Sequence, residues 1–228
     1  MSPAAPRDST SFEVREALAR GGCPVCRLAL RSVGRWLASV AYDQINDIEL
    51  RDRLRAARGF CNTHSHRWLR EVGNVLGTAI VYQDLLTAAL RELDGENVQR
   101  GQRWRAILGG QGAIGDCPAC AAQSEAEQRY LTALLATAAA DPHALEGSEG
   151  LCLRHTRAAQ RRGGPGAERA VQLTRSAIEQ LLAELGEVIR KEDYRFRHEP
   201  RTDAERTAPS RAVARAAGAD GLVDTAGP

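Results

Sequence analysis

The sequence carries two copies of one cysteine and histidine pattern, and this repetition constrains the fold more than any other feature. Each copy begins with Cys-Pro-x-Cys and continues with Gly-x-Cys-x-x-His; 34 residues separate Cys26 from Cys61, and 31 separate Cys120 from Cys152. Both copies together use every cysteine in the chain. The repeated positions are Cys23, Cys26, Cys61, His64, Cys117, Cys120, Cys152 and His155.

These residue types at this spacing predict two metal sites. Two cysteines with two residues between them can reach one ion from a single turn, and a second pair completes the tetrahedron that zinc prefers. We therefore expect two zinc ions, each held by three cysteines and one histidine. Pairing within each copy is the default expectation, and exchange of pairs between the copies stays open. Iron–sulfur clusters are the alternative cofactor, since cysteine is their usual ligand.

Each ligand pair is expected at the start of a helix, where the helix dipole favours a thiolate over a thiol. Three thiolates, one neutral imidazole and a divalent ion carry a net charge of about −1. Helix N-termini and two nearby arginines, Arg27 and Arg154, could offset this charge. His66 is the fallback ligand if His64 does not bind.

The chain is expected to be all-α. Aromatic residues make up only 4% of the sequence, which leaves a core of Leu, Ala and Val, and apolar residues recur at helical rather than alternating spacing. Asn46 or Asp47 is expected to cap one of the helices. Helices are expected at 11–20, 24–42, 47–58, 61–73, 76–90, 118–138, 152–161 and about 166–193.

The repeat predicts two tandem helical units, 11–95 and 105–194, each with its own Cys3His site and both packed as one helical bundle. Residues 109–112 are expected to form the loop between them. From 201 to 228 the chain is rich in Ala, Arg, Pro and Gly, which predicts a flexible tail that is disordered or weakly helical. The charged run 191–201 is expected to fold back over the bundle and bury Tyr194 and Phe196.

Six separated motifs give the chain a resemblance to a bacterial and archaeal family labelled domain of unknown function 6062. The resemblance spans about residues 11–200 and implies the same organisation of the chain, without an established activity. The motifs lie at 23–26, 42–47, 59–64, 117–120, 150–155 and 193–199.

Composition and motifs also limit the function. The first residues lack a basic start followed by an apolar run, and no stretch approaches 18 uninterrupted apolar residues, so we expect a cytoplasmic protein without a membrane span. Six cysteines in that compartment favour metal ligands over structural disulfides. A net charge of +2 argues against nucleic acid as a partner.

A closed shell of four protein ligands leaves no position for water, so the metal is expected to be structural and no catalytic residue is assigned. The sequence has no phosphate-binding glycine loop and no nucleophile elbow. These observations favour a metal-stabilised adaptor that binds a protein partner. An electron-transfer or redox-sensing protein is the alternative that iron–sulfur clusters would imply.

Overall fold

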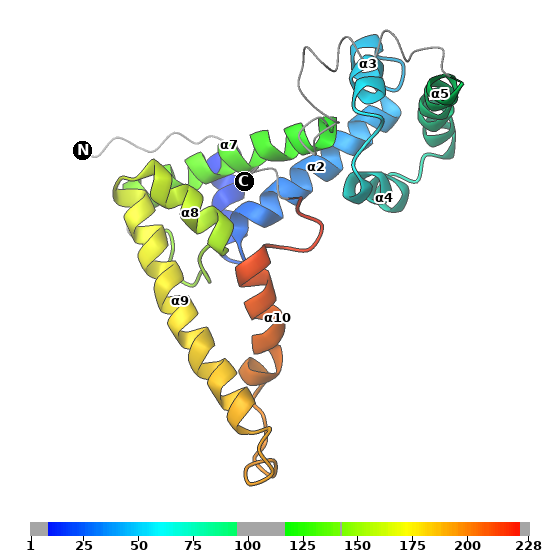
Figure 1. Cartoon of the computed structure of the whole chain (residues 1–228). Coiled ribbons are helices and arrows are strands. Elements are labelled where there is room, and N and C mark those ends of the chain that lie inside the picture. Colours follow the sequence, from blue (N-terminus) through cyan, green and yellow to red (C-terminus); the bar gives the residue numbers. More distant parts are fainter. Residues whose placement is uncertain (1–8, 95–116, 142, 224–228) are drawn as a thin grey trace, which may run out of the picture. The chain divides into compact units, whose positions relative to one another are not determined.

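The computed structural model describes residues 9–94, 117–141 and 143–223, and every regular element in these ranges is an α-helix (Figure 1). The all-α prediction is therefore confirmed. No helix within the described ranges is both long and apolar enough to cross a lipid bilayer. The helices are α1 Ser9–Leu18, α2 Pro24–Tyr42, α3 Ile48–Ala56, α4 Asn62–Glu71, α5 Val75–Leu93, α7 Pro118–Ala140, α8 Leu153–Arg162, α9 Pro165–Arg190 and α10 Asp203–Ala217.

The helices begin where local chemistry favours a start. Proline occupies the first position of α2, α7 and α9, where its missing N–H would have no helical partner in any case. Asp47 caps α3, and its carboxylate accepts a hydrogen bond of 2.7 Å from the Leu50 N–H. The prediction of a cap at Asn46 or Asp47 is confirmed.

The chain forms two compact units that differ from the predicted tandem division. Unit 1 contains the described residues of Met1–Ala29 and Glu127–Leu222, and unit 2 contains those of Leu30–Ala126 and Val223–Pro228. Each unit therefore combines segments from both halves of the sequence. The boundaries fall inside α2 and α7, so each unit takes one end of each helix. The loop predicted at 109–112 lies outside the described residues.

Unit 1 is built around α9, which packs against α8 and α10. Its first turn also approaches α7 closely: a Cβ atom added to Gly166 would lie 1.9 Å from the carbonyl oxygen of Leu135. Only glycine allows two helices to approach this closely. Tyr130, Leu131 and Leu134 of α7 are almost fully buried in this unit.

Unit 2 has an apolar core next to its cysteine and histidine residues. The rings of Phe60 and Trp68 lie 5.5 Å apart, and Trp36 meets Phe60 edge-on at 6.2 Å. Trp68 is fully buried, and its indole N–H donates a 2.8 Å hydrogen bond to the Thr78 hydroxyl. Cys117 and Cys120 belong to the same core, so two of the metal-ligand candidates of unit 2 share a core with its aromatic residues.

The predicted flexible tail instead contains a regular helix, α10. Thr202 and Glu205 form a complete capping box at its start, and α10 packs against α9 and α8. Lys191 Nζ also donates hydrogen bonds of 2.8 Å to both oxygens of Glu205. Capping and this ion pair compensate for the small apolar content of the segment, which explains why composition alone was misleading.

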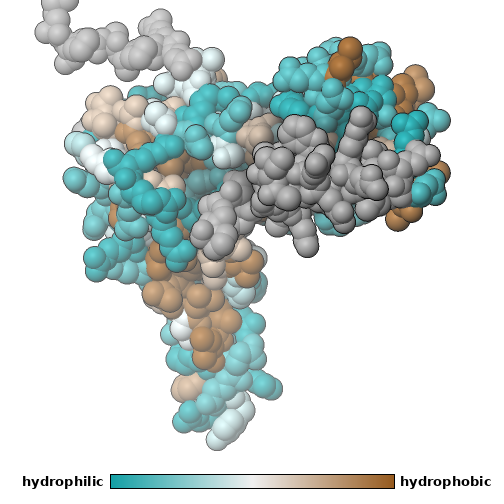
Figure 2. Space-filling view, turned by 45° about the horizontal axis from the view of Figure 1, so that its top comes forward, coloured by the Kyte–Doolittle hydropathy of each residue, from teal (hydrophilic) through white to brown (hydrophobic). Residues whose placement is uncertain are grey.

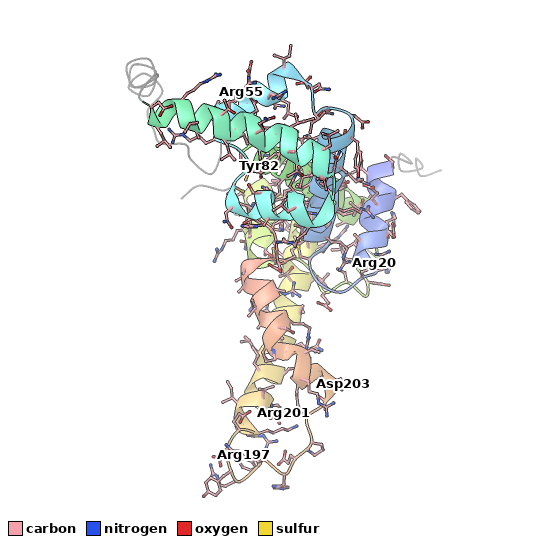
Figure 3. The ribbon with its side chains drawn as sticks, turned by 90° about the vertical axis from the view of Figure 1, so that its right-hand side faces the viewer. Arg20, Arg55, Tyr82, Arg197, Arg201 and Asp203 are labelled. Carbon is pink, nitrogen blue, oxygen red and sulfur yellow. The ribbon has the colours of Figure 1, made fainter. Side chains whose placement is uncertain are left out.

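The hairpin of α9 and α10 carries exposed apolar side chains and a polar tip. Leu182, Ile189 and Val213 are exposed, and Figure 2 shows apolar residues gathered along this part of the molecule. Arg197 and Arg201 lie at the turn between the helices (Figure 3).

The expected burial of both aromatic rings in the α9–α10 turn is wrong. Tyr194 is 83% exposed, and Phe196 is partly covered by two arginines, with the guanidinium carbon of Arg190 4.7 Å and that of Arg195 5.4 Å from the ring centroid. Phe196 therefore makes cation–π contacts with the two arginines, and not the apolar contacts with the bundle that were expected.

Candidate metal centres

Cluster 1 consists of Cys23, Cys26, Cys152 and His155, and it lies in unit 1. His155 Nδ1 lies 3.5 Å from the sulfur of Cys23, 3.4 Å from that of Cys26 and 3.1 Å from that of Cys152. The sulfurs of Cys26 and Cys152 are 3.6 Å apart. Three of these residues are buried, and Cys23 is partly exposed.

Cluster 2 consists of Cys61, His64, Cys117 and Cys120, and it lies in unit 2. His64 Nδ1 lies 3.3, 3.8 and 3.4 Å from the sulfurs of Cys61, Cys117 and Cys120, respectively. The sulfurs of Cys61 and Cys120 are 3.7 Å apart. Cys61 is partly exposed here, at the position equivalent to Cys152 in the other cluster.

The default expectation of pairing within each copy is wrong, because the structure exchanges the pairs. Cys23 and Cys26 meet the Cys-x-x-His of the second half, and Cys117 and Cys120 meet that of the first half. The reason lies in the helices that follow each Cys-Pro-x-Cys. With 19 residues in α2 and 23 in α7, each carries the chain roughly 30 Å before it can turn.

All four ligand pairs share one local construction at the start of a helix. The first residue of each pair is the N-cap, whose carbonyl accepts a hydrogen bond from the backbone N–H four residues later. The second residue is three positions on, in the first turn. Cys61 and Cys152 make no side-chain capping bond, so their sulfurs point to the clusters instead. Two helix N-termini thus converge on each cluster and favour negative charge there.

The distances fit a single ion surrounded by four ligands. A tetrahedron with zinc–sulfur bonds of about 2.3 Å and zinc–nitrogen bonds of about 2.0 Å has ligand-to-ligand edges of roughly 3.5–3.8 Å. The four distances given above for each cluster lie between 3.1 and 3.8 Å. All ligand atoms of a cluster lie within 4.8 Å of one another. Both clusters could therefore hold a metal ion.

The electrostatics of cluster 1 point to a shared proton when no cation is present. Hydrogen bonding with Cys152 and Cys23 raises the pKa of Cys26, whereas hydrogen bonding from Cys23 and Cys26 lowers that of Cys152. Burial lowers the pKa of His155, but its contacts with Cys152 and Cys23 raise it to about 11. This arrangement favours an imidazolium ion beside a thiolate, so the protonated His155 supplies positive charge where a metal cation would otherwise supply it.

Cluster 2 divides its protons in a similar way. Hydrogen bonding from Cys120 lowers the pKa of Cys117 to about 3, and the same contact raises the pKa of Cys120. Burial raises the pKa of Cys61. The three sulfurs cannot all be ionised at this distance without a cation between them, so metal binding must displace protons from the cluster.

A glycine in the left-handed region positions each Cys-x-x-His pair. Gly59 has φ 101° and Gly150 has φ 81°. A Cβ atom at Gly150 would lie 2.7 Å from the Thr174 hydroxyl and 3.0 Å from the Thr174 Cα. This hydroxyl also accepts a 3.0 Å hydrogen bond from the Leu151 N–H. The close contact with α9 therefore fixes the chain just before Cys152.

Substitution Gly150→Ala is expected to destabilise unit 1 by about 2 kcal/mol, because a left-handed alanine is strained and its methyl group collides with Thr174. Gly147→Ala is the matched control: Gly147 has φ 76° and a Cβ there would meet nothing within 4 Å. The control should lose about 1 kcal/mol from backbone strain alone. Urea unfolding of both metal-saturated variants measures the difference. Equal losses would show that the contact with Thr174 does not matter.

The sequence interpretation missed one residue beside cluster 1. Glu127 is buried, and its Oε2 lies 3.4 Å from Nε2 of His155. The available signal was a carboxylate one turn before the apolar residues Tyr130, Leu131 and Leu134 of α7. Arg154 donates a 2.7 Å hydrogen bond to this carboxylate, and Arg27 donates to the carbonyls of Ala17 and Gly21.

The chain just after α10 lies beside cluster 1, whereas the fallback ligand His66 lies outside both clusters. Gly218, just after α10, is so close to cluster 1 that a Cβ there would lie 3.6 Å from the sulfur of Cys26. The segment expected to be a loose tail therefore covers this cluster. The fallback ligand His66 is exposed and belongs to neither cluster.

Fold and site together define an all-α protein with two Cys3His clusters that could each hold a metal ion. No family model matches the chain, and no solved structure matches it. The chain is similar to a protein of Caldicellulosiruptor sp. (strain Rt8B.4) described as "Uncharacterized 23.9 kDa protein in xynA 3'region", with 41% identity over 64 residues. The match covers 28% of this chain and 30% of that relative, so less than a third of either chain is compared.

Proposed function

We propose that the protein is a helical binding module whose two units are each stabilised by a structural zinc ion. The observation that carries this proposal is the pair of four-residue clusters, each with three sulfurs and one imidazole nitrogen within 4.8 Å of one another. Cys23, Cys26, Cys152 and His155 would hold one ion. Cys61, His64, Cys117 and Cys120 would hold the other. Bound zinc would link helix starts that are far apart in sequence.

The compactness of the clusters supports one ion rather than an iron–sulfur cluster. Ligands of a multi-iron cluster bind different metal atoms and therefore lie farther apart than ligands that share one ion. In both clusters all ligand atoms lie within 4.8 Å. The shell of four protein ligands supports a structural role, because catalytic zinc keeps a position open for water or substrate.

Exposed apolar side chains support a role in binding another protein. Leu76, Leu86 and Leu90 on α5 are each more than half exposed. Large apolar residues that gather on a surface are typical of interaction sites. The resemblance to domain of unknown function 6062 is part of the same proposal. None of the six cysteines forms a disulfide bond, which favours a reducing compartment such as the cytoplasm.

The test is elemental analysis of tag-free protein purified without oxygen, together with an absorption spectrum of the same sample. We expect about two zinc ions per chain, one for each cluster, and no visible colour. Iron with sulfide and absorption in the visible range would support electron transfer or redox sensing instead. A protein that contains no metal and cannot be loaded with zinc would refute the proposal.

A further inference from the structure

The two units differ in the residue at one repeated position, which in unit 1 lies beside the histidine of the cluster. Glu127 and Val33 occupy equivalent positions, each seven residues after the second cysteine of a Cys-Pro-x-Cys. Glu127 lies beside His155 in unit 1, and Val33 belongs to the apolar core of unit 2. The repeat therefore places a carboxylate in one unit and an isopropyl group in the other.

Glu127 is held in place by its own contacts. Its side chain is 9% exposed, and Arg154 donates a 2.7 Å hydrogen bond to Oε2. The same oxygen lies 3.4 Å from Nε2 of His155, at ion-pair distance. The imidazole ring thus has the three sulfurs on its Nδ1 side and a carboxylate on its Nε2 side.

Metal binding at Nδ1 would make Nε2 a hydrogen-bond donor, because a neutral imidazole carries its one proton on the other nitrogen. In both histidines Nε2 is buried and makes no hydrogen bond of normal geometry. His155 needs only a small shift to donate to Glu127. For His64, no ion pair with a carboxylate is found in the part of the chain that the structure describes, so its N–H has no such acceptor among these residues.

We propose that Glu127 is a positioning residue for the metal in cluster 1, and that it makes the two centres unequal. It fixes the tautomer and orientation of His155 and increases the basicity of the ligand nitrogen. Partners of this kind change metal affinity by about 10- to 100-fold. Cluster 1 therefore retains its metal longer than cluster 2. This inference rests on the proposed zinc-binding function.

The experiment measures zinc release from the full chain loaded with two equivalents, after addition of excess chromogenic chelator. The wild-type protein is expected to release one equivalent quickly and the other about 10- to 100-fold more slowly. Glu127→Gln should accelerate only the slow equivalent, by a similar factor, with an unchanged helical circular dichroism spectrum before chelation. Glu125→Gln is the matched control, since it removes one carboxylate from an exposed position of the same helix. It should leave both rates unchanged.

The zinc-release experiment gives different results if this inference is wrong and if the proposed zinc-binding function is wrong. The inference would be overturned if both zinc ions left the wild-type protein at one common rate. It would also be overturned if Glu127→Gln accelerated the release of both equivalents or of neither. Zinc binding itself would stand in each of these cases. A chain that takes up no zinc would instead contradict the proposed function itself. Selective acceleration of one equivalent cannot come from a general loss of stability, which would release both ions.

Discussion

Removal of the metal is expected to unfold both units. Structural zinc sites contribute about 10–16 kcal/mol of apparent binding free energy, whereas a folded domain is stable by only about 5–15 kcal/mol. Each cluster joins helix starts that lie more than 50 positions apart in the sequence, such as those at Cys61 and Cys120 in unit 2. Without an ion, nothing would join these helix starts, and the sulfurs would take up protons because they cannot all be ionised side by side. Circular dichroism should show loss of most helical signal after chelation.

The control for this prediction is the same chelator saturated with zinc beforehand, which should leave the spectrum unchanged. Added zinc should restore the helices of the chelated protein. Acid should act as chelation does, because ligand thiols must lose their protons to bind. A metal-free protein that keeps its helical signal and its unfolding temperature would show that the clusters do not stabilise the fold.

Substitution Gly166→Ala is expected to destabilise unit 1 strongly. The added Cβ would lie 1.9 Å from the Leu135 carbonyl oxygen and 3.1 Å from the Ala139 nitrogen. Both are backbone atoms, so no side-chain rotation can relieve the overlap and α9 must move away from α7. We expect a loss of about 3 kcal/mol, or a fall of roughly 10 °C in the midpoint of thermal unfolding.

Gly186→Ala on the same helix is the matched control, because a Cβ there would meet nothing within 4 Å. Alanine favours a helix over glycine, so this variant should be stabilised by up to about 1 kcal/mol. Under metal-saturating conditions, the midpoints of thermal unfolding of the two variants should therefore shift in opposite directions from that of the wild-type protein. An unchanged midpoint for Gly166→Ala would show that the close approach of α9 and α7 is not required.

Local features of the fold were predictable from the sequence, and the pairing of distant segments was not. The spacing Cys-x-x-Cys encodes an N-cap and a residue in the first turn, which is a local property of one helix start. Which two helix N-termini come together depends on where α2 and α7 end. The spacing of the cysteines and histidines in the sequence does not indicate this. The structure gathers the eight predicted residues into two clusters, but the default pairing was wrong.

For the C-terminal helix α10, a local sequence signal was present, but the prediction followed the composition of the segment instead. Thr202 and Glu205 have the spacing of a capping box, and the structure forms one. The Ala, Arg, Pro and Gly content of 201–228 instead led to the expectation of a disordered or weakly helical tail. Contacts with α9 and the ion pair with Lys191 supply the stability that composition did not suggest.

The buried partner of Glu205 has a practical consequence for chemical labelling. Lys191 is the only lysine in the chain, and it is 8% exposed, with hydrogen bonds to Glu205 and the Pro200 carbonyl. An amine in this environment is shielded from acylating reagents. The protein therefore contains a single side-chain amine whose acylation would report directly on separation of α9 from α10, with no engineered probe.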